Sequence, residues 1–281
     1  MIPQTFEYRA PATLKEALAL AGNGESKILA GGMSLIPLMK LRLASPAEVV
    51  DLGRIPGLNE ITEANGIVTI GAMATHHEIE SSPVIRAHCP LLAEAASHIG
   101  DAQVRNMGTI GGSIAHADPA ADYPAPLLAL EARLRLVSAT SERVISLDGF
   151  LIDAFTTALE PGEIIVEVQV PVEESNEGYS YQKVAHPASG FAVVGVAARI
   201  KQEAGKITMA RIAVTGMAAR AFRDLAVEKL LESGAPVAQA VAKLGESSEA
   251  NSDLYASADY RLHLARTHAA RAVAAAIPRI S

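Results

Sequence analysis

The sequence predicts an α+β protein of two domains, and three observations lead to this prediction. Short apolar runs and helical segments follow one another over the first 170 residues. A proline and a polar stretch at residues 171–178 then interrupt the pattern, as is typical of a linker. Beyond it, three strand-like runs precede three helical segments, which indicates an antiparallel sheet backed by helices. We therefore expect one domain over residues 1–172 and a smaller one over residues 178–281.

The first domain is expected to consist of two subdomains, about residues 1–58 and 59–172. In the first, Thr13 is a suitable N-cap and Glu16 can complete a capping box, so a helix is predicted up to Gly22. The other predicted elements of this subdomain are strands at 27–30 and 48–52 and a helix at 35–42.

The second subdomain is predicted to begin with a strand and a capped helix. Thr75 is a plausible N-cap for a helix at 75–80, and the alanine-rich residues 90–99 suit a buried helix. Strands are predicted at 66–71, 133–138 and 164–170. In the C-terminal domain the predicted elements are strands at 179–184, 192–200 and 207–215 and helices at about 223–233, 236–245 and 259–276.

Composition excludes several classes of function. The formal net charge is −7 without a basic cluster, and aromatic residues make up only 4%, so a nucleic-acid surface is not expected. Cys89 is the only cysteine, which excludes an internal disulfide and a thiolate-ligated cluster on this chain. No stretch is apolar enough to span a bilayer and the first residues lack a signal-peptide pattern, so we expect a cytoplasmic protein.

Two glycine-rich stretches carry most of the functional information. The first glycine segment is Ala30–Ser34, and the second is Thr109–Ser113. Glycine lets a backbone approach a ligand closely and leaves its N–H free to face an anion, so two such segments could hold both phosphates of a dinucleotide. The Rossmann fingerprint G-x-G-x-x-G and the P-loop pattern are both absent.

These segments and their surroundings resemble a known family. Residues 27–40 and 103–113, together with residues 118–124, are similar to the FAD-binding medium subunits of molybdenum hydroxylases, the carbon monoxide dehydrogenase and xanthine dehydrogenase group. The likeness extends over essentially the whole chain and is closest to the carbon monoxide dehydrogenase type. It implies a two-subdomain FAD domain of the vanillyl-alcohol-oxidase type, with FAD held non-covalently between it and the C-terminal domain.

The resemblance also implies which residues contact FAD. Backbone amides of both glycine segments would hold the pyrophosphate and the adjoining ribityl chain. Ile99 and Ile165 would flank the adenine, and Asp122 would accept a hydrogen bond from FAD. Lys183 would reach the cofactor from the C-terminal domain, and Phe191 stands where relatives carry a tyrosine beside the isoalloxazine. The expected cofactor-binding residues are Ile28, Leu29, Ala30, Gly31, Gly32, Met33, Ser34, Leu35, Ile99, Thr109, Ile110, Gly111, Gly112, Ser113, Asp122, Ile165, Lys183 and Phe191.

Two positions depart from the family pattern, and two histidine motifs admit a plainer explanation. Ser113 replaces a frequent asparagine and loses its amide donors, and Phe191 lacks the phenol hydroxyl. The pair His76-His77 is expected to mark the start of a helix, and residues 116–118 (His-Ala-Asp) to form a structural turn, rather than a metal site. No side chain of this chain is predicted to be catalytic or to bind a metal.

The resemblance implies an electron-transfer subunit. Substrate would be oxidised at molybdopterin in a large partner subunit, and electrons would pass through [2Fe–2S] clusters of a small one to FAD and on to an external acceptor. The substrate could be carbon monoxide, an aldehyde or an N-heterocycle, and the assembly is expected to be an (αβγ)₂ heterohexamer. The alternative is a stand-alone flavin-binding or assembly protein without dehydrogenase activity.

Overall fold

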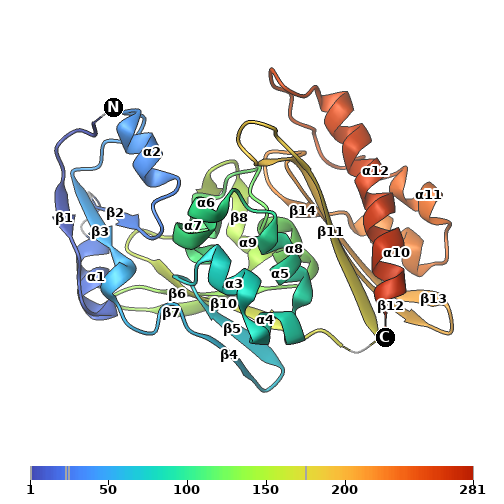
Figure 1. Cartoon of the computed structure of the whole chain (residues 1–281), viewed down its shortest axis with the longest axis horizontal. Helices are drawn as coiled ribbons and strands as arrows, with labels where there is room; N and C mark the ends of the chain where they lie inside the picture. Colours follow the sequence, from blue (N-terminus) through green and yellow to red (C-terminus); the bar gives the residue numbers. More distant parts are fainter. Residues whose placement is uncertain (1, 23, 25, 175, 281) are drawn as a thin grey trace.

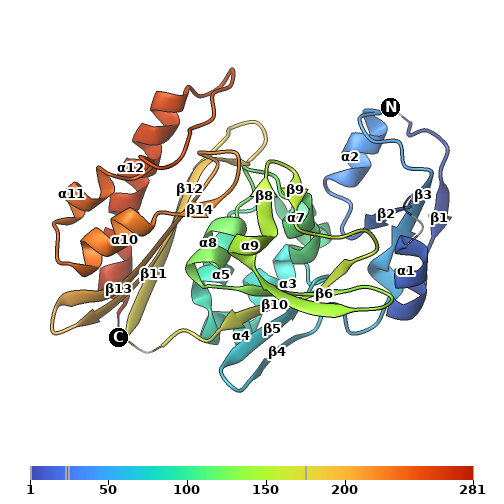
Figure 2. The same cartoon turned by 180° about the vertical axis from the view of Figure 1, so that it is seen from behind.

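The computed structural model describes residues 2–22, 24, 26–174 and 176–280. The described chain forms three units that follow one another along the long axis of the molecule, each built around its own sheet (Figure 1). We call them the parallel-sheet unit, the central unit and the C-terminal unit. The two chain ends lie in the outer units (Figure 2).

The parallel-sheet unit contains three short strands in the order β1-β3-β2, all parallel. Its elements are β1 (Glu7–Arg9), α1 (Leu14–Ala21), β2 (Ser26–Leu29), α2 (Leu35–Lys40), β3 (Glu48–Asp51) and the 3-10 turn η1 (Leu52–Arg54). Thr13 caps α1 as expected, because its hydroxyl accepts the amide of Glu16. The Glu16 carboxylate, however, accepts the amide of Ala12 and not that of Thr13.

The central unit is a five-stranded antiparallel sheet in the order β4-β5-β10-β6-β7, covered by helices. Its strands are β4 (Ile61–Ala64), β5 (Ile67–Gly71), β6 (Arg133–Val137), β7 (Glu142–Ser146) and β10 (Ile164–Pro171). Its helices are α3 (His76–Ser81), α4 (Pro83–His88), α5 (Pro90–Ser97), α6 (Ala102–Met107), α7 (Ile110–His116), α8 (Pro124–Ala129) and α9 (Leu147–Phe150), and a small hairpin joins β8 (Leu151–Asp153) to β9 (Thr156–Thr157).

Strand β10 connects two hydrophobic cores. Ile164 and Val166, near its start, are buried with residues of the parallel-sheet unit such as Val50. Val168 and Val170, further along, are buried in the core of the central unit. Strand β10 therefore contributes side chains to both cores, and the space beside it lies between the two units.

The C-terminal unit is an antiparallel sheet of β11 (Glu177–Ala185), β12 (Ala192–Glu203), β13 (Lys206–Thr215) and the short β14 (Phe222–Arg223). Helices α10 (Leu225–Glu232), α11 (Val237–Val241) and α12 (Ala258–Ala276) cover one face, and the 3-10 turn η2 (Ile277–Arg279) follows. Across neighbouring strands, Arg199 forms a buried, bidentate ion pair with Glu177. The other face of this sheet contacts α5 and α8 of the central unit.

The α+β fold class predicted from the sequence is confirmed, and the predicted helices and strands occur in these positions. The second glycine segment was assigned no secondary structure from the sequence and is largely helical, because residues from Ile110 onward form the first turn of α7. The sequence did not predict the strands β1, β4, β7, β8, β9 and β14 or the helices α4, α6, α8 and α9. Among the described residues, no helix combines the length and apolar character needed to cross a membrane.

Candidate functional site

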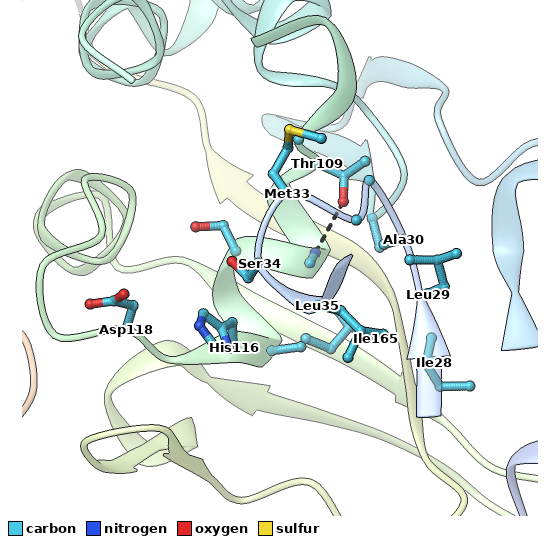
Figure 3. A pocket seen from close by; sticks show the side chains of 18 of the residues that line it. Ile28, Leu29, Ala30, Met33, Ser34, Leu35, Thr109, His116, Asp118 and Ile165 are labelled. Atoms are coloured by element: carbon cyan, nitrogen blue, oxygen red, sulfur yellow. Dashed lines mark hydrogen bonds between the residues drawn. The ribbon is translucent and has the colours of Figure 1, made fainter. Parts of the chain in front are cut away.

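A cavity of about 510 Å³ lies where the parallel-sheet unit meets the central unit, and the loop between β11 and β12 borders it. Its volume is within the range of cofactor sites in proteins. All of the residues that the family resemblance singled out line it, except Ile110 and Lys183. Figure 3 shows its two sides: Ser34, His116 and Asp118 on one, and the apolar side chains of Ile28, Leu29 and Ile165 on the other.

The first glycine segment offers free hydrogen-bond donors to this cavity. Within the described chain, the amides of residues 31–35 donate to no protein acceptor. Gly32 has a φ of +77°, a conformation that only glycine adopts without strain, and it turns the chain into α2. Ser34 stands at the N-cap position of α2, yet its hydroxyl makes no capping bond. A run of unused amides beside a cavity is suited to an anion such as a diphosphate.

The second glycine segment differs, because most of its amides are already used. Gly111 donates to the carbonyl of Ala72 at 2.9 Å, and Ile110 donates to that of Ala74 at 3.0 Å. Gly112 donates to the Thr109 hydroxyl, and Ser113 to the Thr109 carbonyl. The expectation that amides throughout Thr109–Ser113 hold a pyrophosphate is therefore corrected: of these five, only the Thr109 amide lacks an acceptor within the described chain.

The glycines of the two segments allow the segments to touch each other. A Cβ on Gly31 would collide with the carbonyl oxygen of Met107. A Cβ on Gly112 would lie 3.3 Å from the Cβ of Ala30. On the other side, a Cβ on Gly111 would lie 2.7 Å from the carbonyl oxygen of Ala72. Gly31 and Gly112 thus serve close packing between the two units, and Gly111 serves close packing within the central unit, in addition to ligand access.

Ile110 and Lys183 lie behind the cavity wall. Ile110 is completely buried in the core of the central unit. The Lys183 ammonium donates to Asp122 at 2.8 Å and to the carbonyl of His98 at 2.8 Å, and only 3% of this side chain is exposed. Asp122 itself lines the cavity. The structure therefore does not bring Lys183 to the cavity surface, where the resemblance would place it.

The cavity-lining residues that the sequence did not assign to the cofactor include His76, His116 and Asp118. His76 is buried beside Gly108, its Nδ1 lies 3.2 Å from the Tyr123 hydroxyl, and burial lowers the pKa of its imidazole to about 4. His116 and Asp118 reach the cavity at the end of α7, and burial lowers the pKa of His116 while Asp118 opposes this. His116 and Asp118 follow the second glycine segment closely in the sequence, and this proximity could have indicated that they lie at the same site.

Cys89 takes no part in this site. It is completely buried, and burial raises the pKa of its thiol far above the usual value. A thiol that stays protonated is a poor nucleophile, so Cys89 is a structural residue.

The residues present fit FAD, the cofactor implied by the sequence. Free amides at the first glycine segment suit the diphosphate, since each amide can donate one hydrogen bond to an anionic oxygen. Apolar walls from Ile28, Leu29 and Ile165 suit a flat aromatic ring. Hydroxyl and carboxylate groups of Ser34, Asp118 and Asp122 can pair with the polar groups of the chain that joins the two rings.

Comparison with known proteins points to the same cofactor. Residues 4–173 match the family described as "FAD binding domain in molybdopterin dehydrogenase", and residues 179–276 match "CO dehydrogenase flavoprotein C-terminal domain". The chain is 40% identical to the carbon monoxide dehydrogenase medium chain of Hydrogenophaga pseudoflava, with 99% of each chain covered. It is 36% identical to 6-hydroxypseudooxynicotine dehydrogenase complex subunit alpha of Paenarthrobacter nicotinovorans, over 99% of this chain and 97% of the relative.

A solved structure agrees along the entire length. A chain of the Hydrogenophaga pseudoflava carbon monoxide dehydrogenase that lacks the Mo-pyranopterin moiety superposes with a TM-score of 0.97 at 41% identity, and each chain is fully covered. Two family domains in the expected order, whole-length relatives and a matching fold leave one assignment: this chain belongs to the family of FAD-binding medium subunits of molybdenum hydroxylases.

Proposed function

We propose that this chain carries one non-covalent FAD in the cavity between the two glycine segments and acts as the electron-transfer subunit of a molybdenum hydroxylase. The observation that carries this proposal is the row of unused amides at residues 31–35 on the wall of a cofactor-sized cavity. FAD accepts electrons in pairs and can release them singly, which is the chemistry that such a subunit requires. The protein contributes binding, orientation and electrostatics.

In this proposal different residues bind different parts of FAD. Amides of the first glycine segment and of Thr109 donate to the diphosphate, and the apolar residues Ile28, Leu29, Ile99 and Ile165 pack against a ring system. Phe191, which is 45% exposed at the cavity, would shield the isoalloxazine by packing alone, since it has no hydroxyl to donate.

The partners follow from the family. Medium subunits of this kind belong to complexes with a large and a small subunit, and the named relatives include a carbon monoxide dehydrogenase medium chain and an enzyme complex subunit. We propose that the [2Fe–2S] clusters and molybdopterin lie in the partners, as this chain has one cysteine, and that the assembly is an (αβγ)₂ heterohexamer. The oxidised substrate, whether carbon monoxide, an aldehyde or an N-heterocycle, would be bound by the large subunit.

We further propose that the chain divides into domains at residues 1–172 and 178–281, with subdomains meeting near residue 58. The succession of three sheets along the chain supports this division. The cytoplasmic location stays a prediction.

The test is to identify the bound cofactor. Precipitation of the purified chain with acid should release intact FAD at about one molecule per polypeptide. Recovery of FMN, of NAD or of nothing after reconstitution with FAD would contradict the proposal. The chain alone should oxidise no substrate, whereas the co-expressed three-subunit complex should bleach its flavin absorbance when substrate is added. An isolated chain that turns over a substrate would instead be a self-sufficient flavin oxidase.

A further inference from the structure

A short segment of the cavity wall, residues 118–122, is held mainly by the C-terminal unit. The Thr215 hydroxyl donates to the carbonyl of Pro119 or Ala121, at 2.9 and 2.7 Å. Two backbone bonds add to this, from Gly216 to Pro119 and from Ala192 to Ala120. The position of this wall segment therefore depends on β12 and β13, which follow it by about seventy residues or more.

The last residue of the segment, Asp122, is clamped by two side chains of β11. The Tyr181 hydroxyl donates to its Oδ1 at 2.6 Å, and the Lys183 ammonium donates to its Oδ2 at 2.8 Å. All three side chains are almost completely buried. Lys183 also donates to the carbonyl of His98, which directly precedes the cavity residue Ile99.

Space for the Tyr181 ring is cleared by the neighbouring strand. A Cβ on Gly195 of β12 would collide with the Tyr181 hydroxyl, so glycine is required where the phenol crosses. Burial raises the pKa of Tyr181 well above its usual value, so the hydroxyl remains a donor throughout the physiological range. Burial also raises the pKa of Asp122, while Lys183 and Tyr181 oppose that rise by bonding to the carboxylate.

A clamped carboxylate is a fixed acceptor. Each carboxylate oxygen has two lone pairs, so Asp122 retains acceptor capacity toward the cavity after accepting both bonds. Because the carboxylate is already fixed before a ligand binds, less conformational entropy is lost on binding. We propose that Tyr181 is a positioning residue, which together with Lys183 orients Asp122 to accept a hydrogen bond from an N–H or O–H group of FAD.

This inference rests on the proposed function, and titration of the apoprotein with FAD separates the two. Tyr181→Phe removes only the hydroxyl, and we expect it to raise the FAD dissociation constant about tenfold, because Asp122 then keeps only one of the two side-chain donors that fix it. Tyr179→Phe, in the same strand and outside this network, is the matched control and should leave the dissociation constant unchanged. The fluorescence and the absorbance of the flavin report binding in both variants.

A double-mutant cycle shows whether Tyr181 acts through Asp122. In the Asp122→Ala background, which has no side-chain acceptor for the Tyr181 hydroxyl, Tyr181→Phe should cause no further loss of FAD affinity. Thr215→Val, which releases the same wall segment from its other side, should also weaken FAD binding and serves as the second variant should Tyr181→Phe not fold.

Two outcomes overturn the inference. One is a Tyr181→Phe protein with a lowered melting temperature and an unchanged FAD dissociation constant, which would make the hydroxyl a purely structural contact between units. The other is an equal loss of affinity in the presence and absence of Asp122. Failure of the wild-type apoprotein to bind FAD would instead overturn the proposed function.

Discussion

The two glycine segments look alike in sequence and do different work. In the first, Ala30–Ser34, the amides from Gly31 onward are free and the chain turns through a positive φ at Gly32. In the second, Thr109–Ser113, the amides from Ile110 onward donate to Ala72, Ala74 and Thr109, and these residues are helical. A glycine pair can thus present donors to a ligand, or let two backbones pack closely. The sequence motif alone does not separate these roles.

The largest expected effect is on the packing role of the second segment. Gly111→Ala should lower the stability of the apoprotein by about 3 kcal/mol or more, because the new Cβ would press on the backbone of Ala72. The melting temperature of the apoprotein measures this. Gly22→Ala is the control, since its Cβ would find ordinary contacts only, at 3.6 Å or more. If the Gly111→Ala protein is stable but fails to bind FAD, the packing role is wrong and the second segment contacts the phosphates directly.

Substitution of Gly32 should affect FAD binding more than the stability of the apoprotein. Gly32→Ala is expected to weaken FAD binding strongly. It should lower apoprotein stability by about 1–2 kcal/mol for the left-handed backbone, and further through the shift of the Ile36 side chain, whose Cδ1 would lie 2.6 Å from the new Cβ. Gly66→Ala is a matched control, because Gly66 has the same φ of +77° and a Cβ added to it would meet no atom within 4 Å. Equal FAD affinity in the two variants would show that the first segment does not present its amides to the cofactor.

The stability of the protein should also depend on pH, through the buried His76 that packs beside the second glycine segment. His76 packs on Gly108, and its folded-state pKa of about 4 is below the unfolded value of 6.5. The unfolded chain therefore binds more protons in this range, and stability should fall as the pH decreases from about 6.5 to 4, by on the order of 2 kcal/mol at pH 5. His76→Gln should flatten this dependence of the melting temperature, whereas His77→Gln, at the exposed neighbour, should not.

The smallest effects concern two hydroxyls at matching positions. Thr109→Val should cost the apoprotein about 1 kcal/mol, because the Thr109 hydroxyl caps α7. Ser34→Ala should leave apoprotein stability unchanged, because Ser34 makes no capping bond, and should reduce FAD affinity instead. Denaturant titration and FAD titration of both variants give the comparison. Identical profiles for the two would mean that the segments do not differ in the way described.

Local patterns predicted much of this fold. The Thr75 capping box is complete in the structure, since Glu78 also bonds back to the Thr75 amide, and the start of α3 is therefore encoded within four residues. The strand patterns of the C-terminal unit were equally clear, because long runs such as β12 are buried on both faces.

What the sequence could not predict depends on contacts between distant residues. Helix α7 contains two adjacent glycines, which are poor helix formers, and it forms because Thr109 caps it and because glycine fits against Ala72. The expected contact of Lys183 with the cofactor depended on a side-chain direction that β11 and Asp122 decide together. The sequence pattern of a single segment does not reveal such contacts between residues that are far apart in the chain.

The strand β10 places its side chains in two cores, and this arrangement affects how resistant the protein is to proteolysis in the cell. The parallel-sheet unit contributes a small core of its own, so its attachment depends on that strand, on the close packing of Gly31 against Met107 and on the ligand in the cavity beside it. A ligand that binds only the folded form stabilises that form increasingly as its concentration rises. FAD supply should therefore set how long the newly made subunit survives proteolysis before its partners capture it.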